Sequence, residues 1–507
     1  MSMLRRTRTI LAAGVIAAIA LVPAVTATSA SAMVMDPVKS TDILALSWTR
    51  HYADNGLPFW YGSPGVAYLD GNGSRPSIVV GDEKGYIWAL HADDGSAVAG
   101  WPYRFGAAVM STPSSIGHGA TAMVFVGTGE SPHPTLGAYA ALHANGTKAW
   151  ALSPYLLPGN RGGHRGVMSS LAVGSIQHSV DVVGGAMGQM QYALRGTNGR
   201  PLLGFPWLQA DTNFSTPAVS NVAGDSRDEI IEGGDSTQGI AGIYHYTNGG
   251  HIRILSSTGN AGKRYKNQGL VCQYNTTEVV QSSPAVGGFL ASGRTGIVVG
   301  TGHFYKTASD RYKVIAIDTS CRKQWAASLD GNTGGSPALA MGIGPGTNGD
   351  HLNVVMMSAR GTVYALDGAT GHRIWSTALG EENESSVTTF RAGSETYIIA
   401  PTLHGAYILK GSTGEVVQRI GDLRMRNAAT VTLDRTTNGH KVIGVTIAGS
   451  KSTGPNGLMQ GWVEHFVLKD PALRDPAPGI DLGAGQWPMF HHDAQLTGDI
   501  ATVARQY

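Results

Sequence analysis

Residues 336–375 read SPALAMGIGPGTNGDHLNVVMMSARGTVYALDGATGHRIW, and this stretch decides the fold. A Ser-Pro start is followed by two apolar runs, 354–357 and 363–366, with glycines between them and a Thr-Gly turn before Trp375. Short apolar runs bounded by turn residues are typical of β-strands joined by hairpins. Because no helical periodicity occurs beyond residue 32, the sequence predicts an all-β fold.

The same unit recurs along the chain, which indicates a repeat architecture. Its first strand starts at eight positions, 43 to 67 residues apart: Ser63, Thr112, Ser170, Thr216, Ser283, Ser336, Ser386 and Ala429. A four-stranded propeller blade takes about 40–50 residues. We therefore predict a single eight-bladed β-propeller of four-stranded antiparallel blades, with seven blades as the alternative. The strand-like run at 43–48 would complete the last blade as a closing strand.

Composition excludes several classes of protein. Glycine accounts for 70 of 507 residues, about twice its ordinary share of about 7%, and charged residues make up only 14%. This excludes a coiled coil and a highly charged disordered tail, and the absence of a three-residue glycine period excludes collagen. Glycine is instead expected at the tight turns between strands, where the backbone needs a positive φ.

The N-terminus has the pattern of a secretory signal peptide. Arg5, Arg6 and Arg8 precede an apolar run at 10–27, and Ala30-Ser31-Ala32 forms a small-residue cleavage site. Cleavage after Ala32 removes three arginines and no acid, so 34 basic and 35 acidic residues remain and the net charge changes from +2 to −1. We expect a secreted, extracellular protein whose mature chain has no transmembrane segment and does not bind nucleic acid.

The chain is expected to have four parts and to act as a monomer. They are a signal peptide at 1–32, an N-terminal segment with the closing strand at 33–62, the β-propeller at 63–470, and a C-terminal tail at 471–507 that packs on the ring. The tail contains the aromatic run 487–493, WPMFHHD, which would form a plug against the ring.

The chain has two cysteines, Cys272 and Cys321. An oxidising compartment permits a disulfide between them. On the chain-entropy model, closing a loop of about 50 residues would stabilise the fold by roughly 4 kcal/mol. Two free thiols are the alternative.

Two kinds of propeller repeat resemble this chain. Gly361 to Asp367, with Thr370-Gly371 and Trp375, resembles the repeat of the pyrroloquinoline-quinone-like (PQQ-like, quinoprotein) propellers, in which the Trp docks on the neighbouring blade. The strings 70–73 and 221–225, each before an apolar run, resemble the FG-GAP/VCBS repeat of secreted propellers. The resemblance implies the fold over nearly the whole mature chain. It implies no single function, because such propellers include alcohol dehydrogenases, an outer-membrane assembly scaffold, lectin-like modules and polysaccharide lyases.

The resemblance also indicates which cofactor to consider, a quinone. Quinone-dependent members commonly use a vicinal Cys-Cys disulfide, a stacking Trp, and a calcium beside a catalytic Asp. This chain has no Cys-Cys pair, so we expect no quinone.

A structural calcium is a second candidate, because calcium takes several oxygen ligands from alternating loop positions. The candidate metal ligands are Asp70, Asn72, Asn221, Asp225 and Asp228. Ala223 stands where the repeat pattern has Asp, so a plain polar turn is the alternative. His491-His492-Asp493 is the densest histidine group, but neighbours on an extended segment point in opposite directions, so a metal there would need further ligands.

Candidate ligand-binding residues follow from propeller geometry. The loops that lead into the innermost strands should meet at one mouth of the central channel. The candidates on these loops are Tyr61, Arg161, His164, Arg165, Asn213, Gln281, Glu382, Arg424 and Arg426, in a wider set with Asn332, Asn383, Glu384 and Asn427. Arginine offers paired N–H donors to carboxylates, so an acidic glycan would fit. Alternatively, these charges pair among themselves around a water-filled channel.

The sequence therefore favours a binding or interaction module for an extracellular polymer, with an acidic glycan as one candidate, or for a protein partner. Two enzymatic alternatives stay open. One is a polysaccharide lyase or hydrolase at the channel mouth, using Arg161, His164, Glu382 and Arg424, with an arginine neutralising a uronate while a neighbouring base takes the proton. The other is a PQQ-dependent oxidoreductase. No catalytic residue can be assigned from the sequence.

Overall fold

The computed structural model describes residues 42–52, 59–71, 75–130, 136–157, 164–209, 211, 213–235, 249–259, 269–346, 350–435, 441–453, 457–470, 482 and 485–501. The chain has two compact units, Met1–Pro37 and Val38–Tyr507, and the described residues all belong to the second. The expected signal peptide at 1–32 lies outside them. None of the helices in the described part is long and apolar enough to cross a membrane.

Eight four-stranded antiparallel sheets make up the fold, which confirms eight blades rather than seven. Blades 1 and 2 consist of β2 (Gly65–Ala67), β3 (Ser77–Gly81), β4 (Tyr86–His91) and β5 (Tyr103–Arg104), then β6 (Ser114–Ile116), β7 (Met123–Thr128), β8 (Ala138–His143) and β9 (Lys148–Leu152). Blades 3 and 4 consist of β10 (Ala172–Gly174), β11 (Asp181–Gly185), β12 (Met190–Arg195) and β13 (Trp207–Leu208), then β14 (Ala218–Ser220), β15 (Glu229–Asp235), β16 (Gly250–Leu255) and β17 (Leu270–Thr276).

The second half of the ring follows the same order. Blades 5 and 6 consist of β18 (Ala285–Leu290), β19 (Arg294–Gly300), β20 (Lys313–Asp318) and β21 (Lys323–Ser328), then β22 (Ala338–Ala340), β23 (Asn353–Met357), β24 (Thr362–Leu366) and β25 (Arg373–Ala378). Blades 7 and 8 consist of β26 (Thr388–Ala392), β27 (Glu395–Thr402), β28 (Gly405–Lys410) and β29 (Val416–Ile420), then β30 (Thr430–Arg435), β31 (Lys441–Ser452), β32 (Met459–Leu468) and β1 (Leu44–Tyr52). The described ranges also contain three short 3₁₀ turns: η1 (Gly119–Thr121), η2 (Pro154–Leu156) and η3 (Ala291–Gly293).

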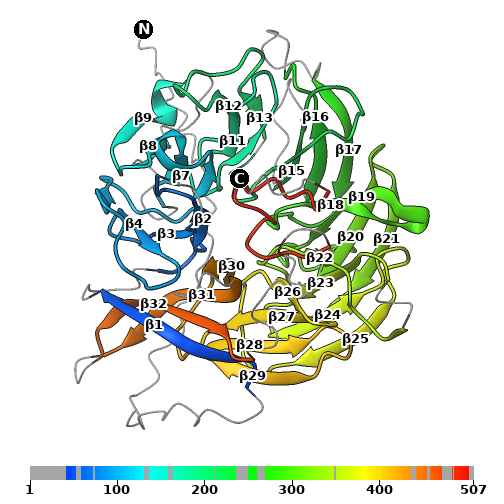
Figure 1. Cartoon of the computed structure of the whole chain (residues 1–507). Helices are drawn as coiled ribbons and strands as arrows, with labels where there is room; N and C mark the ends of the chain where they lie inside the picture. The colour runs from blue at the N-terminus through cyan, green and yellow to red at the C-terminus, as the bar shows by residue number, and fades with distance from the viewer. Residues whose placement is uncertain are drawn as a thin grey trace, which may run out of the picture. The chain divides into compact units, whose positions relative to one another are not determined.

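The innermost strands form a closed ring (Figure 1). The strands β2, β6, β10, β14, β18, β22, β26 and β30 contact one another in this order, and β30 contacts β2 again. Second strands such as β3 and β23 are buried at every residue, whereas the outermost strand β21 is mostly exposed and buries only Trp325. A strand covered on both faces is uniformly apolar, so the continuous runs of the sequence mark the inner strands.

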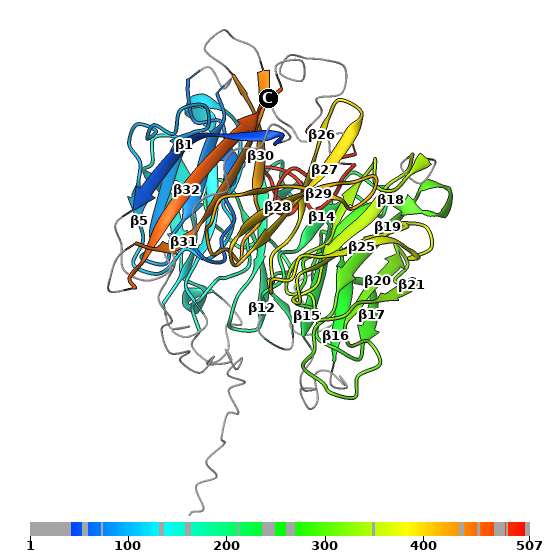
Figure 2. The same cartoon turned by 90° about the horizontal axis from the view of Figure 1, so that it is seen from below.

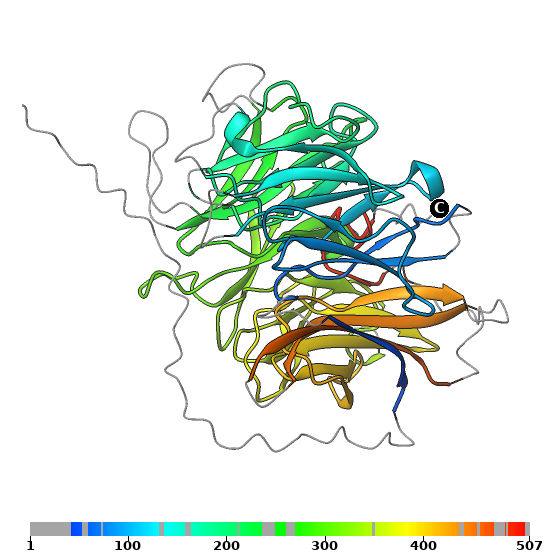
Figure 3. The same cartoon turned by 90° about the vertical axis from the view of Figure 1, so that its left-hand side faces the viewer.

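The ring closes by pairing strands from the two ends of the propeller sequence. β1 runs antiparallel to β32, from Leu44 opposite Leu468 to Tyr52 opposite Gly461, and becomes the outermost strand of blade 8. Figures 2 and 3 show β1, in blue, beside the orange strands of blade 8. The run at 43–48 is therefore the start of the closing strand.

The Ser/Thr starts of the repeats hydrogen-bond each blade to the next. The backbone N–H of Ser63 donates to the hydroxyl of Thr112 at 3.0 Å. The same bond, at 2.8–3.1 Å, continues from blade to blade through Thr112, Ser170, Thr216, Ser283, Ser336 and Ser386. The N–H of Ala428 donates to Ser63 at 2.9 Å, so blade 8 starts at Ala428, one residue before the predicted Ala429. Alanine carries no hydroxyl, so the bond from blade 7 to blade 8 is missing.

A second set of contacts joins the blades near their outer strands, where an aromatic side chain docks on the next blade. The indole N–H of Trp325 donates to Gly368 O at 2.8 Å, and its ring covers Gly371. Gly371 has a φ of +71°, and a Cβ at this position would lie 2.5 Å from the ring. Equivalent indole bonds join Trp48 to Ala92, Trp101 to Ala144, Trp150 to Gly196 and Trp375 to Gly411. Phe205 lies against Gly259 in the same way. The Trp dock implied by the resemblance is therefore present.

The disulfide occupies the dock position between blades 4 and 5. Trp325 pairs with Ala316 just before a β-bulge, and Cys272 pairs with Ile254 just before the equivalent bulge. Cys272 is bonded to Cys321, which has a φ of +57° and lies in the turn that corresponds to the turn of Gly371. A covalent bond thus replaces the indole and glycine pair.

Gln418 occupies the same register position in blade 7, opposite Ile408 and just before a bulge. Its amide accepts from the N–H groups of Ile43 and Leu44 at 3.0 and 2.9 Å and donates to Leu44 O at 2.8 Å. In the other blades a turn connects the third strand to the fourth, whereas in blade 8 the fourth strand, β1, begins a separate part of the chain. The backbone groups of Ile43 and Leu44 at its start therefore need a hydrogen-bonding partner, which Gln418 provides.

Residues 485–501, here called the axial strap, run once around the inside of the ring (red in Figure 1). Their carbonyl groups accept hydrogen bonds from the backbone N–H groups of Met341, Thr389, Val431, Ser115, Val173, Val219 and Val286, in blades 6, 7, 8, 2, 3, 4 and 5. Met489 and Leu496 pack on Val66 of blade 1. The strap therefore contacts every blade, and its side chains are mostly buried. The inner wall of the ring is therefore lined by this segment of chain.

Candidate functional site

The loops that lead into the innermost strands share one face of the ring, here called the entry face. Antiparallel pairing places the hairpins between second and third strands on the same face. Binding residues are concentrated on loops carried by a rigid scaffold. Because the strap lies against the inner strands of the blades, we take the entry-face loops as the candidate place for a ligand.

Five side chains come together on this face between blades 7, 8 and 1. They are Trp60, Tyr61, Glu384, Arg424 and Arg426, here called the arginine patch. Arg426 Nη1 lies 3.1 Å from Glu384 Oε2 and 3.4 Å from the Tyr61 hydroxyl. The guanidinium carbons of Arg426 and Arg424 lie 5.0 and 5.9 Å from the centre of the Trp60 ring. Arg426 thus links the loops that enter blades 7, 8 and 1, and both arginines lie beside one indole.

Backbone hydrogen bonds hold the patch in place. The N–H of Arg426 donates to Trp60 O at 3.2 Å, and the N–H of Arg424 donates to Ser450 O at 2.8 Å. A guanidinium over an indole ring uses its flat face and leaves its in-plane N–H groups available. Arg424 is exposed and forms no ion pair with any side chain in the described part of the chain. The patch can therefore accept an anionic group, above all a carboxylate.

The other predicted site residues lie elsewhere. Asn213 is buried and donates to Gln191 Oε1 at 2.6 Å, and Gln281 donates to Asp235 Oδ2 at 3.2 Å. Arg165 stacks over Tyr155 at 4.6 Å. His164 precedes Arg165 between blades 2 and 3, Glu382 is exposed on the loop before β26, and Arg161 lies outside the described residues. The structure therefore unites Tyr61, Arg424 and Arg426 from the predicted set, with Glu384 from the wider set.

Sequence analysis missed Trp60 and a buried ionic network in blade 4. Glu232, Arg253 and Gln273 stand opposite one another on three neighbouring strands. Arg253 bonds Gln273 at 2.6 Å and Glu232 at 3.4 Å, and Gln209 also donates to Glu232. Burial raises the pKa of Glu232 to about 7, and Arg253 opposes that rise. A charged residue inside an apolar strand, as in GHIRIL at 250–255, was the available signal.

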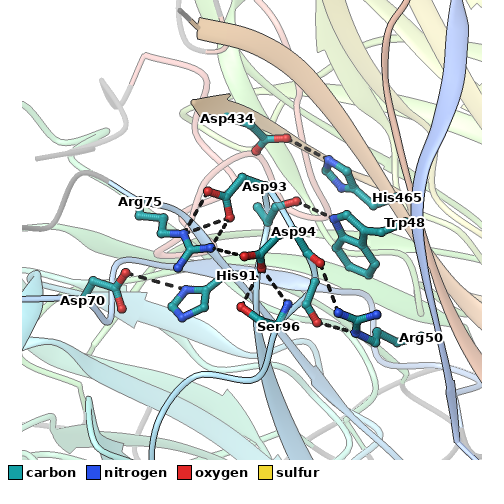
Figure 4. A network of polar contacts seen from close by, with 12 residues as sticks. Trp48, Arg50, Asp70, Arg75, His91, Asp93, Asp94, Ser96, Asp434 and His465 are labelled. Atoms are coloured by element: carbon teal, nitrogen blue, oxygen red, sulfur yellow. Dashed lines mark hydrogen bonds and ion pairs between the residues drawn. The ribbon is translucent and has the colours of Figure 1, made fainter. Parts of the chain in front are cut away.

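Blade 8 contains a carboxylate, imidazole and hydroxyl in hydrogen-bonded series. His465 lies 2.8 Å from both Asp434 Oδ2 and Thr446 Oγ1, and Trp48 stacks on the imidazole at 5.1 Å (Figure 4 shows Trp48, His465 and Asp434). His465 and Thr446 are 0% exposed. A substrate cannot reach the hydroxyl, so this series stabilises the sheet and is not a catalytic triad.

The candidate calcium ligands make local contacts. Asp70 lies 3.7 Å from His91 (Figure 4), and Asn72 lies outside the described residues. Asn221 and Asp225 accept from backbone N–H groups of their own turn, and Asp228 accepts from Ser175 N at 2.6 Å. Within the described ranges, no three His, Cys, Asp or Glu side chains are arranged to hold a metal ion. A calcium site stays a prediction.

The residues present do not fit a quinone. Cys272 and Cys321 are 49 residues apart, and the bond between them joins the outermost strand of blade 4 to blade 5. They therefore cannot supply the vicinal disulfide of quinone sites. No step of a mechanism is derived through that cofactor.

His491 and His492 lie within the axial strap. Their φ values of +58° and +80° show a left-handed turn in place of the predicted extended segment. His491 lies 2.7 Å from Leu496 O and 3.1 Å from Pro284 O, and burial lowers its pKa to about 4. Gly498 packs against its ring, since a Cβ there would lie 2.5 Å from His491 Cε1. This histidine therefore holds the strap on the ring.

Comparisons with known proteins bear on the fold. Residues 258–445 match a PQQ-type family described as outer membrane protein assembly factor BamB, over less than half of the chain. No curated protein sequence matches this chain. The resemblance of 70–73 and 221–225 to FG-GAP/VCBS repeats stays a prediction.

Three solved structures share 12% sequence identity with the chain. The quinohemoprotein alcohol dehydrogenase of Comamonas testosteroni has a TM-score of 0.51 over 84% of this chain and 76% of its own. BamB of Moraxella catarrhalis has 0.48 over 83% and 99%, and the V. cholerae biofilm matrix protein Bap1 has 0.48 over 92% and 97%. At this identity the likeness concerns the fold alone. The sheet order makes the chain an eight-bladed β-propeller, and residues 258–445 carry its match to the PQQ-type repeat family.

Proposed function

We propose that this protein is a secreted binding module for an extracellular polymer, and that the arginine patch binds acidic groups of a polysaccharide. The observation that carries the proposal is the exposed Arg424 guanidinium, held beside Trp60 without a carboxylate partner among the described side chains. A planar guanidinium donates two parallel N–H bonds to a carboxylate. The aromatic ring limits the freedom of the arginine before the ligand arrives, which lowers the entropic cost of binding.

Two further observations support binding rather than catalysis. Glu384 is already paired with Arg426, and the described loops of the patch bring no histidine into contact with the arginines. The buried strap also leaves the polymer outside the ring, on the entry face, where a long chain can pass across the loops. The disulfide fits an oxidising, extracytoplasmic compartment.

Calorimetry with galacturonate oligomers tests the proposal. Arg424→Ala should weaken binding at least tenfold, because one charge-assisted hydrogen bond contributes roughly 1.5–3 kcal/mol. Arg165→Ala is the matched control, since Arg165 also stacks on an aromatic ring of the entry face but lies between blades 2 and 3. Equal binding by wild type and Arg424→Ala, or release of unsaturated products from the oligomers, would contradict a non-catalytic arginine patch.

A further inference from the structure

The two arginines of the arginine patch are in different states. Both guanidinium groups lie beside the Trp60 ring, at 5.0 Å for Arg426 and 5.9 Å for Arg424. Arg426 already faces a carboxylate, because its Nη1 lies 3.1 Å from Glu384 Oε2. Arg424 is exposed and has no carboxylate partner among the described side chains. One arginine is therefore open to an anionic ligand, and the other is occupied by a side chain of the protein itself.

The contact between Glu384 and Arg426 uses little of the guanidinium. The same nitrogen, Nη1, contacts both the Glu384 carboxylate and the Tyr61 hydroxyl, which lies at 3.4 Å. A guanidinium carries five N–H groups and binds a carboxylate best through two parallel bonds. The side chains of Arg426 and Glu384 are 31% and 40% exposed, and ion pairs this exposed contribute little to stability. A ligand carboxylate that binds Arg426 through two bonds can therefore replace Glu384 at low cost.

Glu384 is held beside Arg426 by its own loop and by blade 6. Its N–H donates to Asn383 Oδ1 at 2.7 Å. Its side chain packs along Gly334, where a Cβ would lie 2.7 Å from Glu384 Cβ and 3.4 Å from Glu384 Cδ. The side chain thus lies between the loop that enters blade 6 and Arg426. Its charge offsets the repulsion between two guanidinium groups beside one ring, as the carboxylates of a bound ligand can also do.

The two arginines suit a ligand with acidic groups close together. A single acidic group bound to Arg424 leaves Glu384 in place on Arg426. When one acid unit of a polymer binds Arg424, the next unit is tethered beside Arg426 and competes there at a high effective concentration. The tethered carboxylate can form both parallel bonds to the guanidinium, whereas Glu384 contacts one nitrogen. The second acid unit therefore wins this competition.

We propose that Glu384 stands in for the second carboxylate of the ligand. Arg424 receives one acidic group, and the acidic group of the neighbouring unit takes the place of Glu384 on Arg426. The patch then prefers polymers with acidic groups on consecutive units over polymers with isolated acidic groups. The inference rests on the proposed function, since it adds a second contact for the same polymer at the same patch.

Calorimetry with the full protein tests this inference with two probes of equal length. One is trigalacturonate, in which every unit has a free carboxylate, and the other is trigalacturonate methyl-esterified so that a single unit keeps its free acid. Wild type should bind the fully acidic trimer about tenfold more tightly, because a second charge-assisted contact is gained, and this exceeds the roughly threefold statistical advantage of three carboxylates. Arg426→Gln should reduce the preference to the statistical value.

Glu384→Gln removes the competing charge and keeps the shape of the side chain. It should tighten binding of the fully acidic trimer by about fivefold, which is the upper range for the loss of an exposed ion pair. Glu382→Gln is the matched control, because Glu382 carries the same charge, is exposed on the same loop and forms no ion pair with either arginine within the described ranges. Glu384→Ala repeats the test without a side-chain oxygen that could accept from Arg426, and thermal unfolding verifies that each variant is folded.

Equal tightening in Glu382→Gln and Glu384→Gln would show that net charge alone is responsible and would overturn the role of Glu384. Binding of the fully acidic trimer that is unchanged or weaker in both Glu384 variants would overturn it as well. In either case Arg424→Ala would still weaken binding of both probes, and the proposed function would stand. If Arg424→Ala weakens binding of neither probe, the proposed function itself is wrong.

Discussion

Other blades are joined by a Trp that docks on a Gly, where blades 4 and 5 are joined by the disulfide. Replacing the disulfide by a Trp and Gly pair tests whether the two kinds of contact can substitute for each other at this position. Cys272 stands where Trp325 and Trp375 stand in blades 5 and 6, and Cys321 stands where Gly371 stands. The variant Cys272→Trp with Cys321→Gly should therefore restore a standard dock between blades 4 and 5.

The magnitudes follow from the structure. Removing the bridge with Cys272→Ser and Cys321→Ser frees a loop of 49 residues, which should lower the free energy of unfolding by about 4 kcal/mol. Trp325 is only 7% exposed and donates one hydrogen bond of 2.8 Å. Burial of such a side chain contributes roughly 1.5–3 kcal/mol and the hydrogen bond about 1 kcal/mol. The Trp and Gly pair should thus recover about 3 kcal/mol.

Urea or thermal unfolding of the purified variants measures the difference. Cys272→Ser with Cys321→Gly is the matched control, because it relieves the positive φ of Cys321 without adding the indole. The expected order of stability is wild type, then the Trp and Gly variant, then this control, then the double serine variant. If the Trp and Gly variant is no more stable than the control, the equivalence of the disulfide and the dock is wrong.

Two other predictions concern the ring and its buried acids. Ser283→Ala should lower the free energy of unfolding by about 1–3 kcal/mol, because the N–H of Thr216 loses its buried acceptor. Ala428→Ser should raise it by up to about 1 kcal/mol, because serine supplies the hydroxyl that blade 8 lacks. Denaturant unfolding measures both variants, and equal midpoints for Ser283→Ala and wild type would contradict the role of this bond. Burial raises the pKa of Asp235 to about 7 from its usual 3.8, so between about pH 4 and 7 the folded state holds a proton that the unfolded state has lost, and stability should fall as the pH rises through this range. Asp235→Asn should therefore raise the unfolding midpoint at pH 8 and change it little at pH 4, while a stabilisation that is the same at both values would show that the titration is not responsible.

Much of the fold could be predicted because the repeat motif is itself a structural contact. The Ser or Thr before each inner strand supplies the hydroxyl that accepts from the preceding blade, so counting these residues counted the blades. Blade 8 was the difficult case, since Ala428 lacks the hydroxyl and only the bond to Ser63 shows that it, and not Ala429, is the start.

The candidate site could be predicted in part. Tyr61, Arg424 and Arg426 followed from their place on loops that enter inner strands. Asn213 has the same place in the sequence but is buried against Gln191, and Gln281 is exposed but donates to Asp235. Loop position selects a face of the ring, whereas the direction of each side chain depends on the neighbouring blade.

By itself, the sequence determined the all-β class and the propeller repeat and favoured eight blades with a closing strand, because these follow from local strand and turn patterns that repeat along the chain, whereas the structure decided between eight blades and seven. Only the tertiary structure decided which residues meet. The contact of Arg426 with Trp60 joins residues more than 300 positions apart. The dock role of Cys272 depends on strand register, and the path of the axial strap depends on contacts with all eight blades. These contacts form only when the ring closes, and no local pattern along the chain encodes them.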